Sequence, residues 1–412
     1  MIFRPLIGFK VTIKSGESPK YALRKALVVT RNSTILDSVV EIDIGKSTYT
    51  SKGFRWPRKF PYLLTPTLYT LVNAIPAMRQ LHTVQLKDLI LSRMYLHTIL
   101  SSPSLIHLIL DTVQLPKIGI FPLTRLRKLT LTMMPIWEIV QPLITELATS
   151  LEYLELQWCP FTPPSQLHLP SLPCLQEIRY NHQYYSQSIF LGENPLNEIL
   201  RSASQVTHLH VTGHFLAPVT ACQKSLQHLT TSIWMLSEHV FGIEPFPRLM
   251  HLSLDFFRFT DMVDRPFAPS SFICDHFPMI TSLHLSIPWV LRNYAMAMAR
   301  SQHNVQVLKL DLYIRDWIMD EGIVPDDPLH RVMLAAALHT LKLEVVQSHR
   351  DLERGATQCI RWVFDDVVPY VIGLGGAGLT RIDLSVSRFV ERERILSRQW
   401  RKAPNDGWKT LE

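Results

Sequence analysis

The sequence predicts an α/β repeat protein, a solenoid whose parallel sheet is built from one short strand per repeat. Three observations predict this class: a recurring apolar template, prolines that keep the phase of the template, and short helical patterns between its copies. The alternative is an α/β sandwich with leucine-rich strands. We disfavour it because nothing in a sandwich requires the template and the prolines to share one phase.

The template is an apolar residue, two variable residues, an apolar residue, one variable residue and an apolar residue. Its first position recurs at Leu81, Leu105, Leu126, Leu151 and Leu175, in steps of 24, 21, 25 and 24 residues. This is the period of leucine-rich repeats. Later steps stretch to 31, 33 and 41 residues, which we interpret as insertions on one face. The copies start at Val39, Leu81, Leu105, Leu126, Leu151, Leu175, Val206, Leu226, Leu249, Ile280, Val305, Leu338 and Leu379.

Prolines and capping residues place the elements between these copies. Proline stands two residues before the first apolar position at Pro103, Pro173, Pro247 and Pro278, where it marks the entrance of a strand. The pairs Thr65-Pro66, Asn194-Pro195 and Asp327-Pro328 each precede apolar residues at helical spacing. A capping side chain followed by proline is the expected start of a helix.

The outward, concave face of the predicted sheet and the inserted loops are the expected binding surface. A single strand-and-helix unit cannot bury its apolar face alone, so stacked repeats share one core. We therefore expect a horseshoe with helices on the convex side and a concave parallel sheet. The first, fourth and sixth template residues should face the core, and the third, fifth and usually the seventh should face outward. From these outward positions and their neighbours we select as partner-binding residues His107, Tyr153, Glu155, Trp158, Arg179, His208, His210, His228, His251 and His284.

The mixed polar character of this face favours a protein partner, with Tyr153, Trp158 or Arg179 as anchors within a polar rim. The histidines allow two interpretations. His208, His228 and His251 occupy the same template position in three consecutive copies, on strands expected ~4.8 Å apart. The patch is either a pH-sensitive or metal-binding site, or a solvated face that happens to use histidine. We favour the second, because no cysteine or carboxylate completes a ligand set.

Charge and pattern divide the chain into a basic N-terminal capping segment at 1–60, the repeats at 61–387 and a C-terminal capping helix with tail at 388–412. The first segment holds twelve Lys and Arg against four acidic residues, a net charge of +8, whereas the rest holds 30 against 31. Its run from Lys52 to Phe60 interleaves cations with aromatics. The run either binds nucleic acid or an acidic partner, or is a loop packed on the first helix. We favour the loop, and expect nucleic acid only as an alternative partner.

We expect a protein of the cytoplasm or nucleus. The sequence has no apolar run of 18 residues, so we predict no membrane partner, and the first 16 residues lack the apolar core of a secretory leader. Five scattered cysteines show no metal spacing and are typical of a reducing compartment.

Enzymatic motifs do not occur in the sequence, which has no G-x-S-x-G, H-E-x-x-H or Walker loop. The run Gly373-Leu-Gly-Gly-Ala-Gly378 matches G-x-G-x-x-G but precedes a repeat strand rather than a helix. A dinucleotide site needs the helix. We therefore predict a non-enzyme without cofactor or metal, although an active site can also be assembled across strands.

Residues 20–412 resemble the repeat region of fungal F-box proteins, a leucine-rich-repeat family. The similarity lies in the irregular repeats, in Val39–Ile44, in Trp362–Tyr370 and in Arg401–Glu412 with its Trp408. In that family the repeats select a substrate, and an N-terminal F-box binds the adaptor of a cullin-type ubiquitin ligase. This resemblance implies a substrate-recognition module. No Leu-Pro-x-Glu-type box precedes the repeats, so we expect an adaptor as partner only if such a box exists upstream.

Overall fold

The computed structural model describes residues 8–14, 17–45, 65–115, 125–134, 137–157, 159, 169–182, 195–213, 219–232, 244–255, 271–288, 304–315, 338–348, 379–388, 394–403 and 407–411. The chain divides into two compact units, unit 1 (Met1–Ala217) and unit 2 (Pro218–Glu412). Each unit is an α/β assembly built on a long, open and mostly parallel sheet. The domain boundaries that we place after residues 60 and 387 stay predictions.

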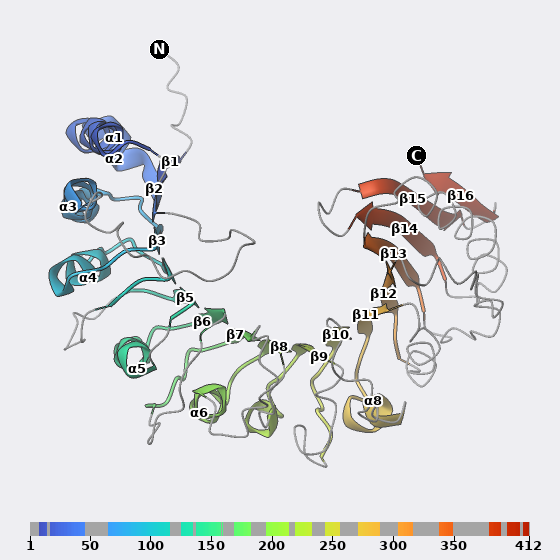
Figure 1. Cartoon of the computed structure of the whole chain (residues 1–412). Coiled ribbons are helices and arrows are strands. Elements are labelled where there is room, and N and C mark those ends of the chain that lie inside the picture. Colours follow the sequence, from blue (N-terminus) through green and yellow to red (C-terminus); the bar gives the residue numbers. More distant parts are fainter. Residues whose placement is uncertain are drawn as a thin grey trace. The chain divides into compact units, whose positions relative to one another are not determined.

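The sheet of unit 1 follows the repeat in the sequence. Its described strands are β1 (Phe9–Lys14), β2 (Val39–Gly45), β3 (Thr83–Lys87), β4 (His107–Asp111), β5 (Lys128–Thr132), β6 (Tyr153–Gln157), β7 (Glu177–His182) and β8 (His208–Gly213). They pair in chain order, and every pair is parallel (Figure 1).

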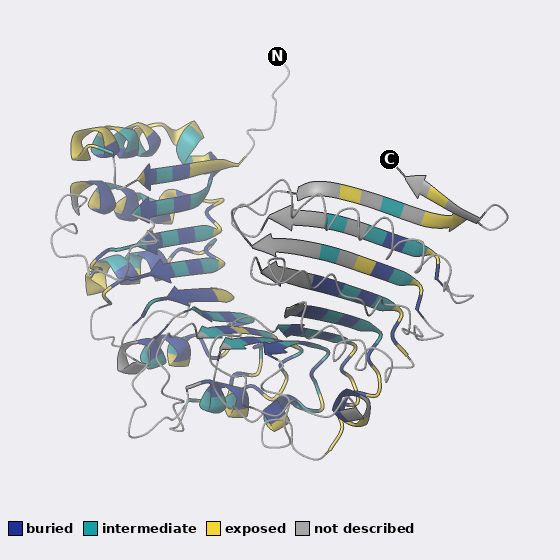
Figure 2. Ribbon diagram, turned by 45° about the vertical axis from the view of Figure 1, so that its right-hand side comes forward, coloured by how far each residue is buried: buried dark blue, intermediate teal, exposed yellow. Residues whose placement is uncertain are grey.

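The register of this sheet places equivalent template residues opposite one another. Leu108, Leu129 and Leu154, all at the fourth template position, follow one another across β4, β5 and β6. Each of the three side chains is fully buried. Along β3 and β6, buried and half-buried residues alternate, as Figure 2 shows. The prediction that the fourth and sixth positions face the core, and the third and fifth face outward, is therefore confirmed for these strands.

Short helices lie along one side of the strands of unit 1 (Figure 1). They are α1 (Pro19–Arg31), α2 (Ser33–Ser38), α3 (Thr65–Ala74), the 3₁₀ turn η1 (Ile75–Ala77), α4 (Arg93–Leu100), α5 (Trp137–Glu146) and α6 (Pro195–Ser202). The predicted helix starts at Thr65 and at Pro195 are confirmed. Ser18 caps the start of helix α1, because its side chain accepts a hydrogen bond from the Tyr21 amide, and Pro19 follows at the first helical position.

A left-handed residue ends three successive strands of unit 1. Asp88, Thr112 and Met133 each follow the last residue of β3, β4 or β5 and have φ of 54°, 55° and 54°. The Met133 amide still donates a hydrogen bond to the Gln157 carbonyl, at 2.8 Å. The left-handed backbone conformation costs about 1–2 kcal/mol for a residue with a Cβ atom. The ladder is thus extended by one hydrogen bond at the expense of local strain.

Unit 2 continues the repeat with longer strands. Its described elements are the 3₁₀ turn η2 (Val219–Cys222), β9 (His228–Ser232), β10 (His251–Asp255), α8 (Ser271–His276), β11 (Ser282–Pro288), β12 (Val307–Arg315), β13 (Thr340–Ser348), β14 (Arg381–Arg388), β15 (Arg394–Ala403) and β16 (Gly407–Leu411). Strands β9 to β14 pair in parallel, and β15 and β16 add antiparallel.

The prediction of a C-terminal capping helix at 388–412 is wrong, because β15 and β16 lie there instead. A helix would leave the backbone groups along the edge of β14 unpaired, whereas an antiparallel strand satisfies them. The register also suits the sequence: Leu396 lies opposite Val386 and Trp400 lies opposite Ile382.

Three further predictions fall outside the described residues, namely the loop from Lys52 to Phe60, the helix start at Asp327-Pro328 and the glycine run from Gly373 to Gly378. Among the helices that the structure does describe, none combines the length and the apolar character needed to cross a membrane.

Candidate functional site

A network of outward side chains joins four strands of unit 1. We call it the Tyr153 cluster and define it as His107, Thr130, Tyr153, Glu155, Gln157 and Arg179. The parallel register places Thr130, Glu155 and Arg179 side by side at the fifth template position of β5, β6 and β7. Neighbouring strands lie ~4.8 Å apart, so outward side chains at one template position can touch.

The carboxylate of Glu155 is the centre of the Tyr153 cluster. The Tyr153 hydroxyl donates to its Oε2 at 2.8 Å, and the Thr130 hydroxyl donates to the same oxygen at 3.2 Å. The Gln157 side-chain amide donates to Oε1 at 2.5 Å. Three donors from two strands therefore fix this carboxylate, and charge-assisted hydrogen bonds of this kind are stronger than neutral ones.

The same network assigns a proton to His107. Its Nε2 lies 3.0 Å from the Thr130 oxygen. Because the Thr130 hydroxyl already donates to Glu155, its oxygen accepts a hydrogen bond from the Nε2–H of His107. Burial and then the charge of Lys128 lower the pKa of His107. His107 is therefore neutral near pH 7 and carries its proton on Nε2.

The ring of Tyr153 is held between polar neighbours. The Arg179 guanidinium carbon lies 5.6 Å from the ring centroid, and the Lys128 ammonium lies 5.9 Å from it. Both distances are within the range of cation–π attraction. The ring of His107 meets it edge-on, with centroids 6.3 Å apart. Burial, and then the hydrogen bond to Glu155, raise the pKa of Tyr153, so its hydroxyl remains a proton donor.

Arg179 and the adjacent strand extend the cluster. The Arg179 Nε donates to Glu177 at 2.8 Å, and its side chain stays half exposed. On β8, His210 lies in register with Arg179 and His208 with Glu177. Burial and then the charge of Arg179 lower the pKa of His210. The guanidinium is thus oriented by one carboxylate while part of it remains accessible to a partner.

Of the predicted site residues, His107, Tyr153, Glu155 and Arg179 form one connected network, and His208 and His210 lie on the neighbouring strand. Trp158 lies outside the described residues. Sequence reasoning did not select Thr130 and Gln157 for the site, although both stand at outward template positions. No sequence pattern marks these two residues, because only the structure shows that their side chains donate hydrogen bonds to Glu155.

His228 and His251 lie in unit 2, opposite each other on β9 and β10, as their shared template position predicts. Their rings stack with centroids 4.1 Å apart and an angle of 7° between planes. A metal ion lies in the plane of each imidazole that binds it, so parallel rings cannot share one ion through these conformations. Among the described residues, no three histidines, cysteines or carboxylates are grouped as a metal site would require. The sixth selected histidine, His284, bonds instead to Ser253 and Asp311.

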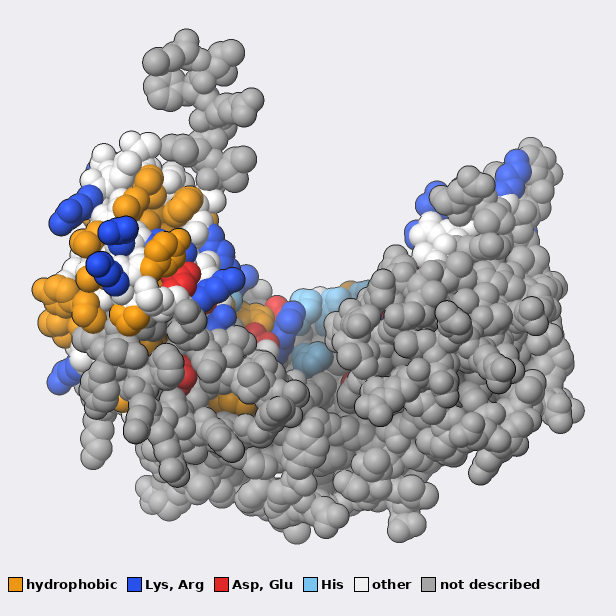
Figure 3. All heavy atoms as spheres, turned by 45° about the horizontal axis from the view of Figure 1, so that its top comes forward, with side chains coloured by type: hydrophobic (Ala, Val, Ile, Leu, Met, Phe, Trp, Pro, Cys, Tyr) orange, Lys and Arg blue, Asp and Glu red, His pale blue; other side chains and the backbone are white. Residues whose placement is uncertain are grey.

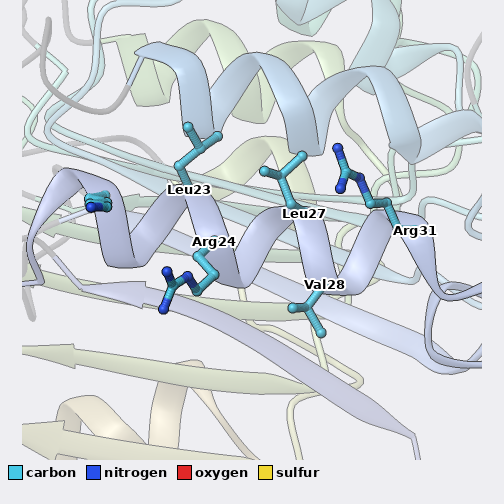
Figure 4. A pocket seen from close by; sticks show the side chains of 6 residues that line it. Leu23, Arg24, Leu27, Val28 and Arg31 are labelled. Atoms are coloured by element: carbon cyan, nitrogen blue, oxygen red, sulfur yellow. The ribbon is translucent and has the colours of Figure 1, made fainter.

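A second surface of unit 1 lies on helix α1. Apolar and basic side chains alternate there around a shallow pocket, shown in Figure 4, in which Leu23 and Leu27 extend from the same side of the helix. The lining residues are Lys20, Leu23, Arg24, Leu27, Val28 and Arg31. Hydrophobic and basic side chains also lie side by side on the surface of this unit in Figure 3. The arrangement suits a partner that is both acidic and apolar.

No protein-family model and no curated protein sequence matches this chain.

Proposed function

We propose that this chain is a leucine-rich-repeat protein. We propose that the outward face of the sheet of unit 1 has no enzymatic activity and binds another protein. The Tyr153 cluster supports this proposal. Tyrosine and arginine are among the residue types that most often dominate protein–protein affinity, and Tyr153 and Arg179 lie against each other within this cluster. The phase of the template supports the repeat class.

The charges of this face favour a protein over a nucleic acid. Lys128 and Arg179 are interspersed with Glu155 and Glu177 on three adjacent strands. A nucleic-acid surface presents basic residues that neutralise phosphates without carboxylates between them. Alternating charges instead fit a partner with complementary polar groups, and they set which partner is accepted.

Pre-organisation supports Tyr153 as an anchor. The hydrogen bond from the Tyr153 hydroxyl to Glu155 fixes the ring before a partner binds. The cations of Lys128 and Arg179, which lie near the ring, also hold it in place. Side chains that are already ordered lose less conformational entropy on binding, which otherwise costs ~0.5–1.5 kcal/mol for each mobile side chain.

The test is quantitative capture of cellular proteins on the intact chain and on two matched double variants. Tyr153→Ala with Arg179→Ala removes the anchor pair. Tyr69→Ala with Arg93→Ala removes the same residue types from exposed positions on α3 and α4. A partner of the proposed face should lose about 30-fold in affinity or more in the first variant, which corresponds to ~2 kcal/mol, and little in the second. Equal binding to all three proteins would refute the proposed face.

The resemblance to fungal F-box proteins adds a finer proposal, namely that the bound protein is a substrate for ubiquitin transfer. This requires a ligase adaptor, which would bind this chain only through a box upstream of the repeats. Recovery of the adaptor with the intact protein would support the proposal. If the partner is recovered reproducibly without any adaptor, the chain binds proteins in another context.

Helix α1 favours a second candidate, an acidic partner or nucleic acid at the N-terminal end. Lys20, Arg24 and Arg31 are exposed around the pocket on this helix. Binding of a single-stranded oligonucleotide should then weaken steeply with salt. Replacement of these three residues by Gln should abolish it, and undetectable binding at low salt would exclude nucleic acid as the partner of this helix.

A further inference from the structure

A chain of hydrogen bonds joins a serine, a histidine and an aspartate on the outward face of unit 2. The Ser253 oxygen lies 3.0 Å from Nδ1 of His284, and Nε2 of the same ring lies 2.7 Å from Oδ2 of Asp311. The three residues come from β10, β11 and β12, which are adjacent parallel strands. Ser253 and His284 are opposite each other in register.

The aspartate determines which imidazole nitrogen carries the proton. Burial alone would raise the pKa of Asp311, but the hydrogen bonds from His284 and Lys309 and the charge of Lys309 help to lower it. An ionised carboxylate only accepts hydrogen bonds, so Nε2 of His284 donates to it. In the neutral ring Nδ1 then has a free lone pair, and the Ser253 hydroxyl donates to it.

The surroundings keep the carboxylate in place and charged. The Asp311 side chain is only 10% exposed, and the Lys309 ammonium lies 3.0 Å from the same Oδ2. Lys309 also lies 3.7 Å from Glu344 on β13. His284 is 29% exposed, and Ser253 is partly exposed. The aspartate is therefore largely buried, whereas the histidine and the serine are both partly exposed.

We propose that Ser253 is a nucleophile for acyl transfer from carboxylic esters, with His284 as its general base and Asp311 as the group that orients the base. A serine, its base and an orienting carboxylate are recognised by their roles rather than by position in the sequence. Here the two ring nitrogens are exchanged relative to the usual arrangement, with Nδ1 facing the serine and Nε2 facing the aspartate. It has no local motif here because each member belongs to a different repeat. The proposal concerns unit 2 and is independent of protein binding by unit 1.

The reaction balances with these groups and water. The Ser253 oxygen attacks the ester carbonyl carbon while Nδ1 of His284 takes the hydroxyl proton. The bond to the alcohol oxygen breaks, that oxygen receives the proton from Nδ1, and an acyl-Ser253 ester remains. Water then attacks this ester with Nδ1 as base, the carboxylic acid leaves, and the proton returns to Ser253.

The same face contains a matched control. Ser286 lies on β11, two residues after His284, and its hydroxyl donates to Asp255 at 3.4 Å. Ser286 is 7% exposed. Ser286 thus has a carboxylate neighbour, whereas Ser253 contacts an imidazole and is more exposed, so the proposal predicts that Ser253 reacts and Ser286 does not.

The experiment exposes the full chain to a fluorophosphonate probe, which forms a serine–phosphorus bond and releases fluoride. Mass spectrometry of the digested protein locates the label. We expect label on Ser253, none after Ser253→Ala and unchanged labelling after Ser286→Ala. Loss of a positioned general base should slow labelling about 100-fold or more in His284→Ala.

Circular dichroism checks that each variant is folded. If His284→Ala does not fold, the comparison of Ser253→Ala with Ser286→Ala still decides. Hydrolysis of p-nitrophenyl acetate should show the same dependence on Ser253. An unlabelled Ser253 in the folded protein, or a labelling rate that is the same in folded His284→Ala, would overturn the proposal.

Discussion

Two adjacent residues of β4 test the alternation on which the fold depends. Leu108 is fully buried and lies in register between Val84 and Leu129, which are also fully buried. Ile109, the next residue, faces outward and is only partly buried. The two side chains have the same number of carbon atoms, so Leu108→Ala and Ile109→Ala remove equal volumes from opposite faces of one strand.

The expected destabilisation differs by several-fold. Leucine-to-alanine changes in a core cost about 2.7–5.0 kcal/mol, with the higher values where the cavity cannot collapse. The strands on both sides of Leu108 are held by ladder hydrogen bonds, so we expect about 4 kcal/mol. For Ile109→Ala we expect about 1 kcal/mol, from its smaller buried area and from strand propensity.

Urea unfolding followed by circular dichroism measures both costs. With a slope of about 3 kcal/mol/M, the midpoint should fall by roughly 1.3 M for Leu108→Ala and by roughly 0.3 M for Ile109→Ala. Equal shifts for the two variants, or a larger shift for Ile109→Ala, would refute the assignment of template positions to the core and outward faces.

Three further predictions concern titration, thiol reactivity and backbone strain. Because burial lowers the pKa of His107 and His210, the unfolded chain binds protons before the native one as pH falls below about 6.5; the free energy of unfolding should therefore decrease from pH 7.5 to 5.5, and urea midpoints should show a smaller decrease in His107→Gln with His210→Gln, whereas an unchanged decrease would contradict these shifts. Burial raises the pKa of the Cys159 thiol to about 12, so iodoacetamide at pH 8 should modify the partly exposed Cys174 and leave Cys159 intact in the native protein, and modification of both at similar rates would show that Cys159 is accessible. Met133 has φ of 54°, a conformation that asparagine tolerates better, so Met133→Asn should raise stability by about 0.5–1 kcal/mol in thermal unfolding, and a lower melting temperature would argue against strain there.

The repeat could be predicted from the sequence because its signal is local and recurs. Each copy of the template shows the same apolar spacing within a few residues. The strand register aligns these copies, as the pairing of Leu129 with Leu154 shows. The C-terminal strands could not be predicted in this way. The run from Arg388 to Lys402 mixes charges with apolar residues at helical spacing. The edge of β14, which decides in favour of a strand, is close in sequence, but the spacing within this run does not show that the edge is open for pairing.

The candidate site, too, could be predicted from the sequence only in part. Template positions predict that Tyr153, Glu155 and Arg179 share a face, because the two-residue period of a strand fixes it. They do not predict that Thr130 connects His107 to Glu155, since this depends on side-chain conformations. Likewise, the sequence places His228 beside His251 but gives no information about the stacking of their rings.

Site-specific photo-crosslinking tests most directly whether this face binds a protein. A photoreactive amino acid would replace Lys128, which is exposed at an outward position of β5 beside Tyr153, or Met94, which is 57% exposed on α4. We predict a specific crosslinked protein from position 128, lost when Tyr153→Ala is added, and none of that protein from position 94. The same protein crosslinked from position 94 but not from position 128 would contradict binding through the outward face.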